Sequence, residues 1–418
     1  MSTNDNGNGE RRVGVWIVGA LGSVSALVAS GLEAMKAGLA GPTGLVTSAP
    51  DFEGAGLIDL SSLVIGGHEV RGGDLAASAE EFARANGVLS REVLDAARPG
   101  LLSASADLRP GLTLNCGEAI RKLAPLPADL DARPLSEIVA SIQRDLREFK
   151  ERRGLDDVIV VNLASAEPEA ALPREFSYLE SLTALIAQDR RELFPASVLY
   201  AFAAIDAGFP YVNFTSSTGS SLASLEELAV RRGVPHAGRD GKTGETLVKT
   251  VLAPMFVARR LKVLSWEGHN LLGNRDGQVL DAPANNLAKV KDKDAALRQI
   301  LGDEKAHSRV RIDYVPSLGD WKTAWDFIHF EGFLGARMSL QFTWQGCDSA
   351  LAAPLVIDLV RLAELAHRSG EKGAMRHAGC FFKAPLGGGS HDFHRQMDDL
   401  AAYAADHHVS SRSRKSRA

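Results

Sequence analysis

The sequence predicts an α/β fold in which parallel strands alternate with helices, and three observations support this prediction. Apolar runs typical of buried parallel strands occur at VGVWIV, LSSLVIGG, VIVVNL and FPYVNF. Stretches rich in Ala, Leu, Glu and Arg at helical spacing separate these runs. The chain also has 40 glycines against 17 prolines, as expected where many tight turns join strands to helices.

Length and composition indicate how many folding units the chain has and exclude several classes of protein. A chain of 418 residues exceeds the size of one hydrophobic core, so two or more folding units are expected. Hydrophobic residues make up 45% and charged residues 24%, which excludes wholesale disorder, and a net charge of −5 argues against a nucleic-acid partner. Cys116, Cys347 and Cys380 lie far apart without a CxxC, a pattern typical of a reducing compartment rather than of disulfides or a zinc thiolate site.

The N-terminal region begins with a polar stretch, residues 1–12, that we expect to be a disordered tail. The next 20 residues, 13–32, contain no charge and follow Arg11 and Arg12, as a signal peptide or membrane span would. Glycines and serines interrupt this run, however, and it divides into a β-rich half and a helical half. We therefore interpret it as a buried strand, a glycine turn and a helix, with no membrane partner.

Further elements follow in order through the first half. The second strand ends at Gly66-Gly67-His68-Glu69, and residues 74–150 are mostly helical in pattern. DDVIVVNLASAEP is a buried strand that runs into a turn, PASVLYAFAAIDAG is a helix, and FPYVNFTSS is the next strand. This alternation predicts a parallel sheet that is covered on both faces.

The pattern changes beyond Gly238. Residues 243–260 form one predicted helix, LKVLSW a strand, and residues 267–294 a loop rich in Asn, Gly and Lys. VRIDYVP and ARMSLQFTW alternate as strands of a mixed sheet do. A long amphipathic helix begins near Asp348, CFFKAPLGGG is a predicted short strand and turn, and residues 406–418 form a basic tail expected to be disordered.

The first turn has the context of a dinucleotide site. Gly19-Ala20-Leu21-Gly22-Ser23-Val24 joins the first strand to the first helix, where free N–H groups and the helix dipole favour a pyrophosphate. The motif is only G-x-x-G, so a tight turn that binds nothing remains open. Glu69 is a candidate acceptor for a ribose hydroxyl, and the alternative is an exposed turn carboxylate.

Lysines and aspartates are concentrated among glycines and asparagines in the second half. Each alone would usually be a solvated charge, but Lys322 follows Trp321 and Lys383 follows two phenylalanines, which indicates partial burial. A buried lysine needs an acid, a charged ligand or a lost proton. Lysines that converge on one cavity would suit a sugar phosphate, or chemistry that builds an enolate or alkoxide.

Other reaction classes lack their motifs. The sequence contains no G-x-S-x-G, HExxH or G-x-x-x-x-G-K-[ST]. His391 and His394 lie three residues apart without an acid or cysteine pattern beside them, so no metal site is expected.

Five ordered motifs resemble a known family. PASVLYAFAAIDAGFPYVNFTSS, DGKTGETLVKTVLAPMFVARRLKV with HNLLGNRDG, YVPSLGDWKTAWD, CDSALAAPLVIDLV and FKAPLG are similar in order and spacing to the inositol-3-phosphate synthase (myo-inositol-1-phosphate synthase) family. The resemblance implies an NAD-binding Rossmann domain (residues 13–245 and 351–405) with an inserted α/β catalytic and tetramerisation domain (residues 246–350). It also implies a cytoplasmic homotetramer.

The resemblance also implies a reaction. The family converts D-glucose 6-phosphate to 1D-myo-inositol 3-phosphate: NAD+ oxidises C5, a proton leaves C6, the enolate closes on the C1 aldehyde, and NADH reduces the C5 ketone. Because the cofactor is regenerated, the enzyme is an isomerase. Its substrate partner is a small sugar phosphate.

The motifs assign residues to this chemistry by resemblance. Lys289 matches the lysine that takes the C5 hydroxyl proton, Lys293 and Lys322 match lysines that hold the phosphate and the C5 oxygen, and Lys383 matches the lysine that stabilises the C1 oxyanion. The acids of the same site are Asp276, Asp320 and Asp348. Substrate contacts fall at Thr243, Gly244, Asn270, Leu272 and Asn274, and cofactor contacts at the glycine turn, Glu69, Ala164, Ser165 and Asp240.

Some positions depart from the family pattern. Arg239 replaces a frequent acid, Arg275 replaces a frequent Asn, and Glu245 replaces a frequent Gln, which would add an acid near the phosphate that Arg275 could offset. Two alternatives therefore stay open: a paralogue that cyclises a related sugar phosphate, and a non-catalytic protein that binds NAD or a sugar phosphate.

Overall fold

The structure is a computed structural model that describes residues 11–124, 129–169, 171–281, 297–303 and 306–415, with side-chain surroundings up to residue 408. Lys289 and Lys293 lie outside the described residues.

The larger unit contains a seven-stranded parallel sheet in the order β11-β6-β5-β4-β1-β2-β3. Its strands are β1 (Val13–Val18), β2 (Leu63–Glu69), β3 (Leu108–Pro110), β4 (Asp157–Asn162), β5 (Tyr211–Asn213), β6 (Pro235–Gly238) and β11 (Gly373–Ala374). The strand order reverses at β1, since β2 and β3 lie on one side and β4 on the other. Ligands of such sheets bind at this reversal, beside the carboxyl ends of the strands.

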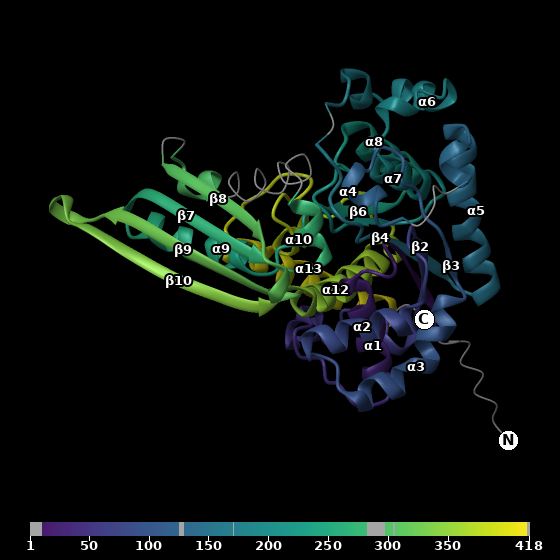
Figure 1. Ribbon diagram of the computed structural model, residues 1–418, viewed down its shortest axis with the longest axis horizontal. Coiled ribbons are helices and arrows are strands. Elements are labelled where there is room, and N and C mark those ends of the chain that lie inside the picture. Colours follow the sequence, from purple (N-terminus) through teal and green to yellow (C-terminus); the bar gives the residue numbers. More distant parts are fainter. Residues whose placement is uncertain (1–10, 125–128, 170, 282–296, 304–305, 416–418) are drawn as a thin grey trace.

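Helices cover both faces of this sheet (Figure 1). One hydrophobic cluster lies between the sheet and α1 (Ser23–Lys36), α2 (Leu75–Asn86), α3 (Arg91–Ser105) and α12 (Asp348–Arg368). The other joins it to α5 (Leu135–Arg153), α6 (Leu179–Ala187), α7 (Ala196–Asp206) and α8 (Ala223–Arg232). Burial on both faces explains why every residue of β1 and β4 is buried. It also explains why the two strands contain no charged residue except Asp157, the first residue of β4.

The smaller unit is a four-stranded sheet in the order β10-β9-β7-β8, made of β7 (Lys262–Leu272), β8 (His307–Tyr314), β9 (Trp321–Glu331) and β10 (Arg337–Cys347). β8 is parallel to β7, whereas β9 is antiparallel to β7 and β10, so the predicted mixed sheet is confirmed. Helix α9 (Glu245–Ala258) packs against it through Phe256, Trp266 and Ile328. In Figure 1 the β9–β10 hairpin projects far from the parallel sheet.

Three expectations about local structure were wrong. The predicted loop from residue 267 begins too early, because 267–272 continue β7; inward-facing Gly268 and Asn270 hid the alternation. Cys380 and Phe381, where the predicted short strand begins, are instead the end of a 3-10 helix, Arg376–Phe381. Helix α13 (Phe393–Lys415) also continues through most of the tail expected to be disordered from 406, and His407 contacts Tyr403 and Glu371 there.

The described N-terminal end also begins earlier than expected. Arg11, assigned above to the disordered tail, pairs with buried Glu364 at 2.7 Å, and the Arg12 amide donates to Asp156. Within the described ranges, no helix combines the length and apolar character needed to cross a bilayer.

Candidate active site

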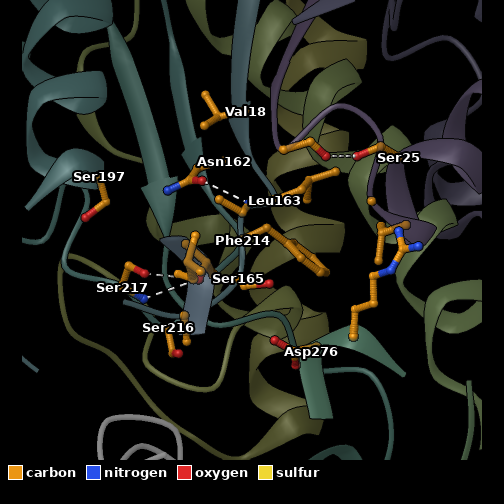
Figure 2. Close-up of a pocket in the computed structure, with 18 of the residues that line it drawn as sticks. Val18, Ser25, Asn162, Leu163, Ser165, Ser197, Phe214, Ser216, Ser217 and Asp276 are labelled. Carbon is orange, nitrogen blue, oxygen red and sulfur yellow. Dashed lines mark hydrogen bonds between the residues drawn. The ribbon is translucent and has the colours of Figure 1, made fainter. Parts of the chain in front are cut away.

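One cavity lies at the carboxyl ends of β1, β4, β5 and β6, where the strand order reverses. Its wall combines the glycine turn after β1 with the loops after β2, β4 and β5 and with residues of the second unit. Figure 2 shows Ser25 on one side of this cavity, Ser197 on the opposite side and Asp276 at a third side. The reversal point therefore brings residues from both units together.

The glycine turn is shaped for close approach. Gly19 has φ +86°, and a Cβ there would lie 3.0 Å from the backbone of Ala164. Gly22 caps α1, and among the described side chains none bonds to that helix N-terminus. The exposed N–H groups and positive end of α1 therefore suit a pyrophosphate, so the turn fits NAD. Gly19, Gly22, Ser23 and Val24 line the cavity with Ala164 and Ser165, whereas Ala20 and Leu21 are buried behind it.

Glu69 is the last residue of β2 and is only 8% exposed, so the exposed-carboxylate alternative is wrong. Its Oε2 accepts the Leu21 N–H at 2.6 Å, and its Oε1 accepts the N–H groups of Val70 and Arg71 at 3.0 Å. The carboxylate lines the cavity and also holds the glycine turn.

The cavity has a wall of hydroxyl groups, of which the sequence analysis named only Ser165. Thr215, Ser216 and Ser217 follow β5, and Ser197 lies in the first turn of α7. Ser165, Ser197, Ser216 and Ser217 are labelled in Figure 2. Both VNLASAEP and NFTSS follow buried strands that pair side by side, and this shared position is the signal that could have found them.

Glu167 joins the segments of this wall. Its carboxylate accepts the Ser197 N–H at 2.8 Å and the Ser197 hydroxyl at 2.5 Å, and its own N–H donates to Ser217. Burial raises the pKa of Glu167 to about 7, against the opposing effect of these hydrogen bonds.

Lys383 and Asp240 form the most buried ion pair of the cavity. The Lys383 Nζ lies 2.7 Å from Asp240 Oδ1, and the two residues are 5% and 3% exposed. Asp240 has φ +59°, and the Lys383 N–H donates to its carbonyl oxygen. In the described part of the chain, Asp240 Oδ2 is buried without a hydrogen-bond partner. Asp240 belongs to the cavity lining, and a buried oxygen without a partner calls for a hydrogen-bond donor.

Lys322 and Asp348 lie on the same cavity. Lys322 from β9 is 6% exposed, and its Nζ lies 4.0 Å from Asp348 Oδ1. The same oxygen accepts the Thr243 hydroxyl at 2.8 Å. Lys322, Lys383, Asp348, Thr243 and Asp240 therefore share one wall, although they span 143 positions of sequence.

Asp320 has a different place. It is 1% exposed, does not belong to the cavity lining, and accepts hydrogen bonds from the Asn274 amide, the Ser349 hydroxyl and N–H, and the Cys347 thiol. Burial raises its pKa from the usual value. Asp320 thus ties the start of α12 to the turn that contains Asn274.

The remaining sequence candidates divide into two groups. Asn274, which caps α10 (Arg275–Leu280), and Asp276 line the cavity. Gly244, Asn270 and Leu272 are buried and do not belong to its lining. Lys242, one residue before Thr243, is directed instead to Gln396 at 2.6 Å, and burial lowers its pKa to about 8.

The departures from the family pattern are accommodated in an unexpected way. Glu245 is fully buried and lies 2.5 Å from Lys249, which is 3.3 Å from Asp326. Arg275 lines the cavity but pairs with Glu81 of α2 at 2.7 Å. The expectation that Arg275 offsets Glu245 was therefore wrong, because buried Lys249 does so.

Three features define the protein as an NAD-dependent α/β enzyme: a Rossmann-type sheet, a glycine turn without a side-chain cap, and buried lysines on one cavity. Comparison with known proteins identifies the family within this class of enzymes. The family model described as myo-inositol-1-phosphate synthase matches residues 13–404. The chain belongs to this family, and its cofactor is NAD.

Relatives and solved structures agree. Inositol-3-phosphate synthase 1 of Bacteroides thetaiotaomicron is 33% identical over 411 residues, covering 93% of this chain and 91% of the relative. Inositol-3-phosphate synthase of Spirodela polyrhiza is 36% identical over 245 residues, covering 56% of this chain and 48% of the relative. The crystal structure of inositol-3-phosphate synthase from Caenorhabditis elegans has the same fold, with a TM-score of 0.83 at 24% identity over 94% of this chain and 86% of that one. The predicted fold class and family resemblance are confirmed.

Proposed function

We propose that this protein cyclises D-glucose 6-phosphate to 1D-myo-inositol 3-phosphate. The observation that best supports this is the meeting of Lys322, Lys383 and the glycine turn on one cavity, in a chain of the myo-inositol-1-phosphate synthase family. When bound, NAD supplies a hydride acceptor for a sugar carbon and later returns the hydride, so no net redox change results.

The two described lysines suit the charges of this reaction. A protonated lysine stabilises an alkoxide or enolate by charge and hydrogen bonding, most strongly where water is excluded. Lys383 is held by Asp240 within hydrogen-bond distance, so we assign it to the C1 oxyanion at ring closure. Lys322, 4.0 Å from Asp348, is assigned to the C5 oxygen or the phosphate.

The acids have supporting parts in the proposal. Asp348 orients Lys322 and Thr243, and Asp240 orients Lys383. Asp276 and Asn274, which line the same cavity, would bind sugar hydroxyls. Lys289 as the base for the C5 hydroxyl, and Lys293 as a phosphate ligand, remain predictions.

A homotetramer and a cytoplasmic location complete the proposal. The sheet face opposite α9 presents Trp325, which is 40% exposed, stacked on Phe327, and the nearby hairpin tip presents Phe333 at 86% exposure. Apolar side chains in that position suit contact with a second copy of the chain. The predicted boundaries at residues 245/246 and 350/351 place this sheet in the proposed tetramerisation domain.

The test is direct. Purified protein incubated with NAD+ and glucose 6-phosphate should form inositol phosphate, detected by 31P NMR and mass spectrometry, without accumulation of NADH. Stoichiometric build-up of NADH would instead indicate an ordinary dehydrogenase. A panel of phosphorylated sugars in the same assay separates the proposed substrate from a related one.

A further inference from the structure

The last turn of α2, in the larger unit, contacts the turn that precedes Lys322 in the second unit. The Asn86 side-chain oxygen accepts the Asp320 N–H at 2.8 Å, and the Asn86 carbonyl oxygen accepts the Trp321 indole N–H at 3.0 Å. Gly319, at φ +56°, leaves room for this contact, because a Cβ there would lie 2.7 Å from Asn86 Oδ1. The larger unit therefore holds the second unit just before a lysine of the cavity.

We propose that Asn86 is a positioning residue for Lys322: by holding residues 319–321, it places the Lys322 ammonium group where the sugar phosphate requires it. The inference rests on the proposed function. It deepens that function, because it assigns a part in the reaction to a residue that does not line the cavity and belongs to none of the five motifs of the family resemblance.

Asn86 is itself firmly held. Leu75 and Phe82 of α2 are buried in the hydrophobic cluster on one face of the parallel sheet. The Asn86 side-chain N–H group donates to the Phe82 carbonyl oxygen at 3.0 Å, which directs the amide oxygen toward the Asp320 N–H. The Asn86 carbonyl belongs to the last turn of the helix, where carbonyl oxygens have no partner within the helix and can accept a donor from outside it.

Lys322 depends on the turn that Asn86 holds. It is the second residue of β9, which pairs with β10 through Lys322 and Trp321, whereas its pairing with β7 ends at Thr323. The Lys322 N–H donates to the Asp320 carbonyl oxygen at 3.0 Å, so a shift of Asp320 would be passed directly to Lys322. Misplacement of a reacting group by about 1 Å can slow a reaction about 100-fold.

Loss of the Asn86 oxygen would cause such a shift. Asp320 is 1% exposed, and its N–H has the Asn86 side chain as its acceptor. A buried N–H group without an acceptor is costly, so the turn would move until this group reaches water or another oxygen. Helix α2 would remain, because alanine is the best helix former.

The experiment is a double-mutant cycle of Asn86→Ala and Lys322→Met in the full chain. Calorimetry measures glucose 6-phosphate binding to protein loaded with NADH, which cannot accept a hydride from the sugar. The stoichiometry of NADH binding gives the folded fraction of each variant, and inositol phosphate formation gives the turnover of the chains that retain Lys322. Arg84→Ala, exposed in the same turn of α2, is the matched control and should change neither readout.

With Lys322 present, Asn86→Ala should weaken glucose 6-phosphate binding about threefold to tenfold and lower turnover at least about tenfold, at unchanged NADH stoichiometry. In the Lys322→Met chain, Asn86→Ala should change binding by less than about twofold, because the group that it positions is gone.

Two outcomes would overturn the inference: equal weakening of binding in both backgrounds, which would show that Asn86 acts on the fold as a whole, and an Asn86→Ala chain with wild-type binding and turnover. A wild-type chain that binds glucose 6-phosphate but forms no inositol phosphate would overturn the proposed function alone. A wild-type chain that does not bind glucose 6-phosphate would overturn both.

Discussion

Replacement of Lys383 by Met tests whether its ammonium group serves the reaction or only balances Asp240. The variant keeps the side-chain volume but leaves the Asp240 carboxylate buried at 3% exposure without its 2.7 Å partner. Breaking a buried ion pair costs about 3–5 kcal/mol, against a total stability of about 5–15 kcal/mol for a typical domain. Lys383→Met should therefore fold, with reduced stability.

The double variant Lys383→Met/Asp240→Asn separates the two roles. It removes both charges, so it should recover about 2–3 kcal/mol relative to the sum of the single variants. Activity should not recover, because the oxyanion still lacks its cation, and turnover should stay at least about 100-fold below wild type. Surface Lys122→Met, which breaks a pair with Glu118, is the control and should change stability by less than about 1 kcal/mol.

Urea unfolding followed by circular dichroism gives the stabilities, and inositol phosphate formation gives the turnover. Calorimetry should show NAD+ binding retained in Lys383→Met. Turnover of Lys383→Met near the wild-type rate would refute its catalytic assignment. A double variant no more stable than the sum of the singles predicts would refute the coupling between the two side chains.

Three further predictions concern the turn, the hydroxyl wall and the buried acids. Gly19→Ala adds a Cβ 3.0 Å from the Ala164 backbone at φ +86°, so it should lower the free energy of unfolding by about 1–3 kcal/mol and weaken NAD+ binding in calorimetry. Gly38→Ala is the control: it also lies at positive φ but is exposed, so it should affect stability alone. Glu167 has a folded pKa near 7 against an ordinary 4.5, so the unfolded chain releases this proton first and stability falls between pH 4.5 and 7. In Glu167→Gln, the fall in the free energy of unfolding between pH 4.5 and 7 should be smaller by up to about 3 kcal/mol, as measured by urea unfolding at several pH values. If stability depends on pH in the variant as it does in the wild type, Glu167 is not the group that titrates. Lys249→Met removes the cation that pairs with buried Glu245 and Asp326, so it should lower the free energy of unfolding by about 3–5 kcal/mol. A decrease below about 1 kcal/mol would mean that the two acids are neutral.

Much of the fold follows from local sequence patterns. The runs VGVWIV and VIVVNL identify β1 and β4 because strands buried on both faces need apolar side chains at every position. The glycine turn, Lys322 and Lys383 could be selected because glycine spacing and aromatic neighbours are local signals. β7 was cut short because Gly268 and Asn270 occupy its buried face, where alternation predicts apolar residues.

The contacts that complete the site could not be predicted in the same way. The Asp320 N–H donates to the side-chain oxygen of Asn86, 234 residues away, and Arg275 pairs with Glu81, 194 residues away. Both partners lie on α2, and no local pattern in that helix marks them as neighbours of the second unit. The role of Glu167 could not be predicted either, because its hydrogen-bond partner Ser197 comes from α7, 30 residues later in the sequence.

The acids of this site divide by the number of hydrogen bonds that they already accept. Asp320 accepts four, from a side-chain amide, a hydroxyl, a thiol and a backbone N–H, so its lone pairs are committed to joining α12 to the Asn274 turn. Asp240 uses one oxygen for Lys383, and its other oxygen has no hydrogen-bond partner among the described residues. An acid that acts on a ligand needs free acceptor capacity, and a saturated one can only hold its neighbours in place. Asp320→Asn should therefore misplace Asn274 and Ser349, and so lower stability in urea unfolding, whereas Asp240→Leu should also remove a direct ligand contact. By resemblance, Asp276, Asp320 and Asp348 were predicted as acids of the catalytic site and Asp240 as a cofactor contact. In the structure Asp240, Asp276 and Asp348 line the cavity, whereas Asp320 does not.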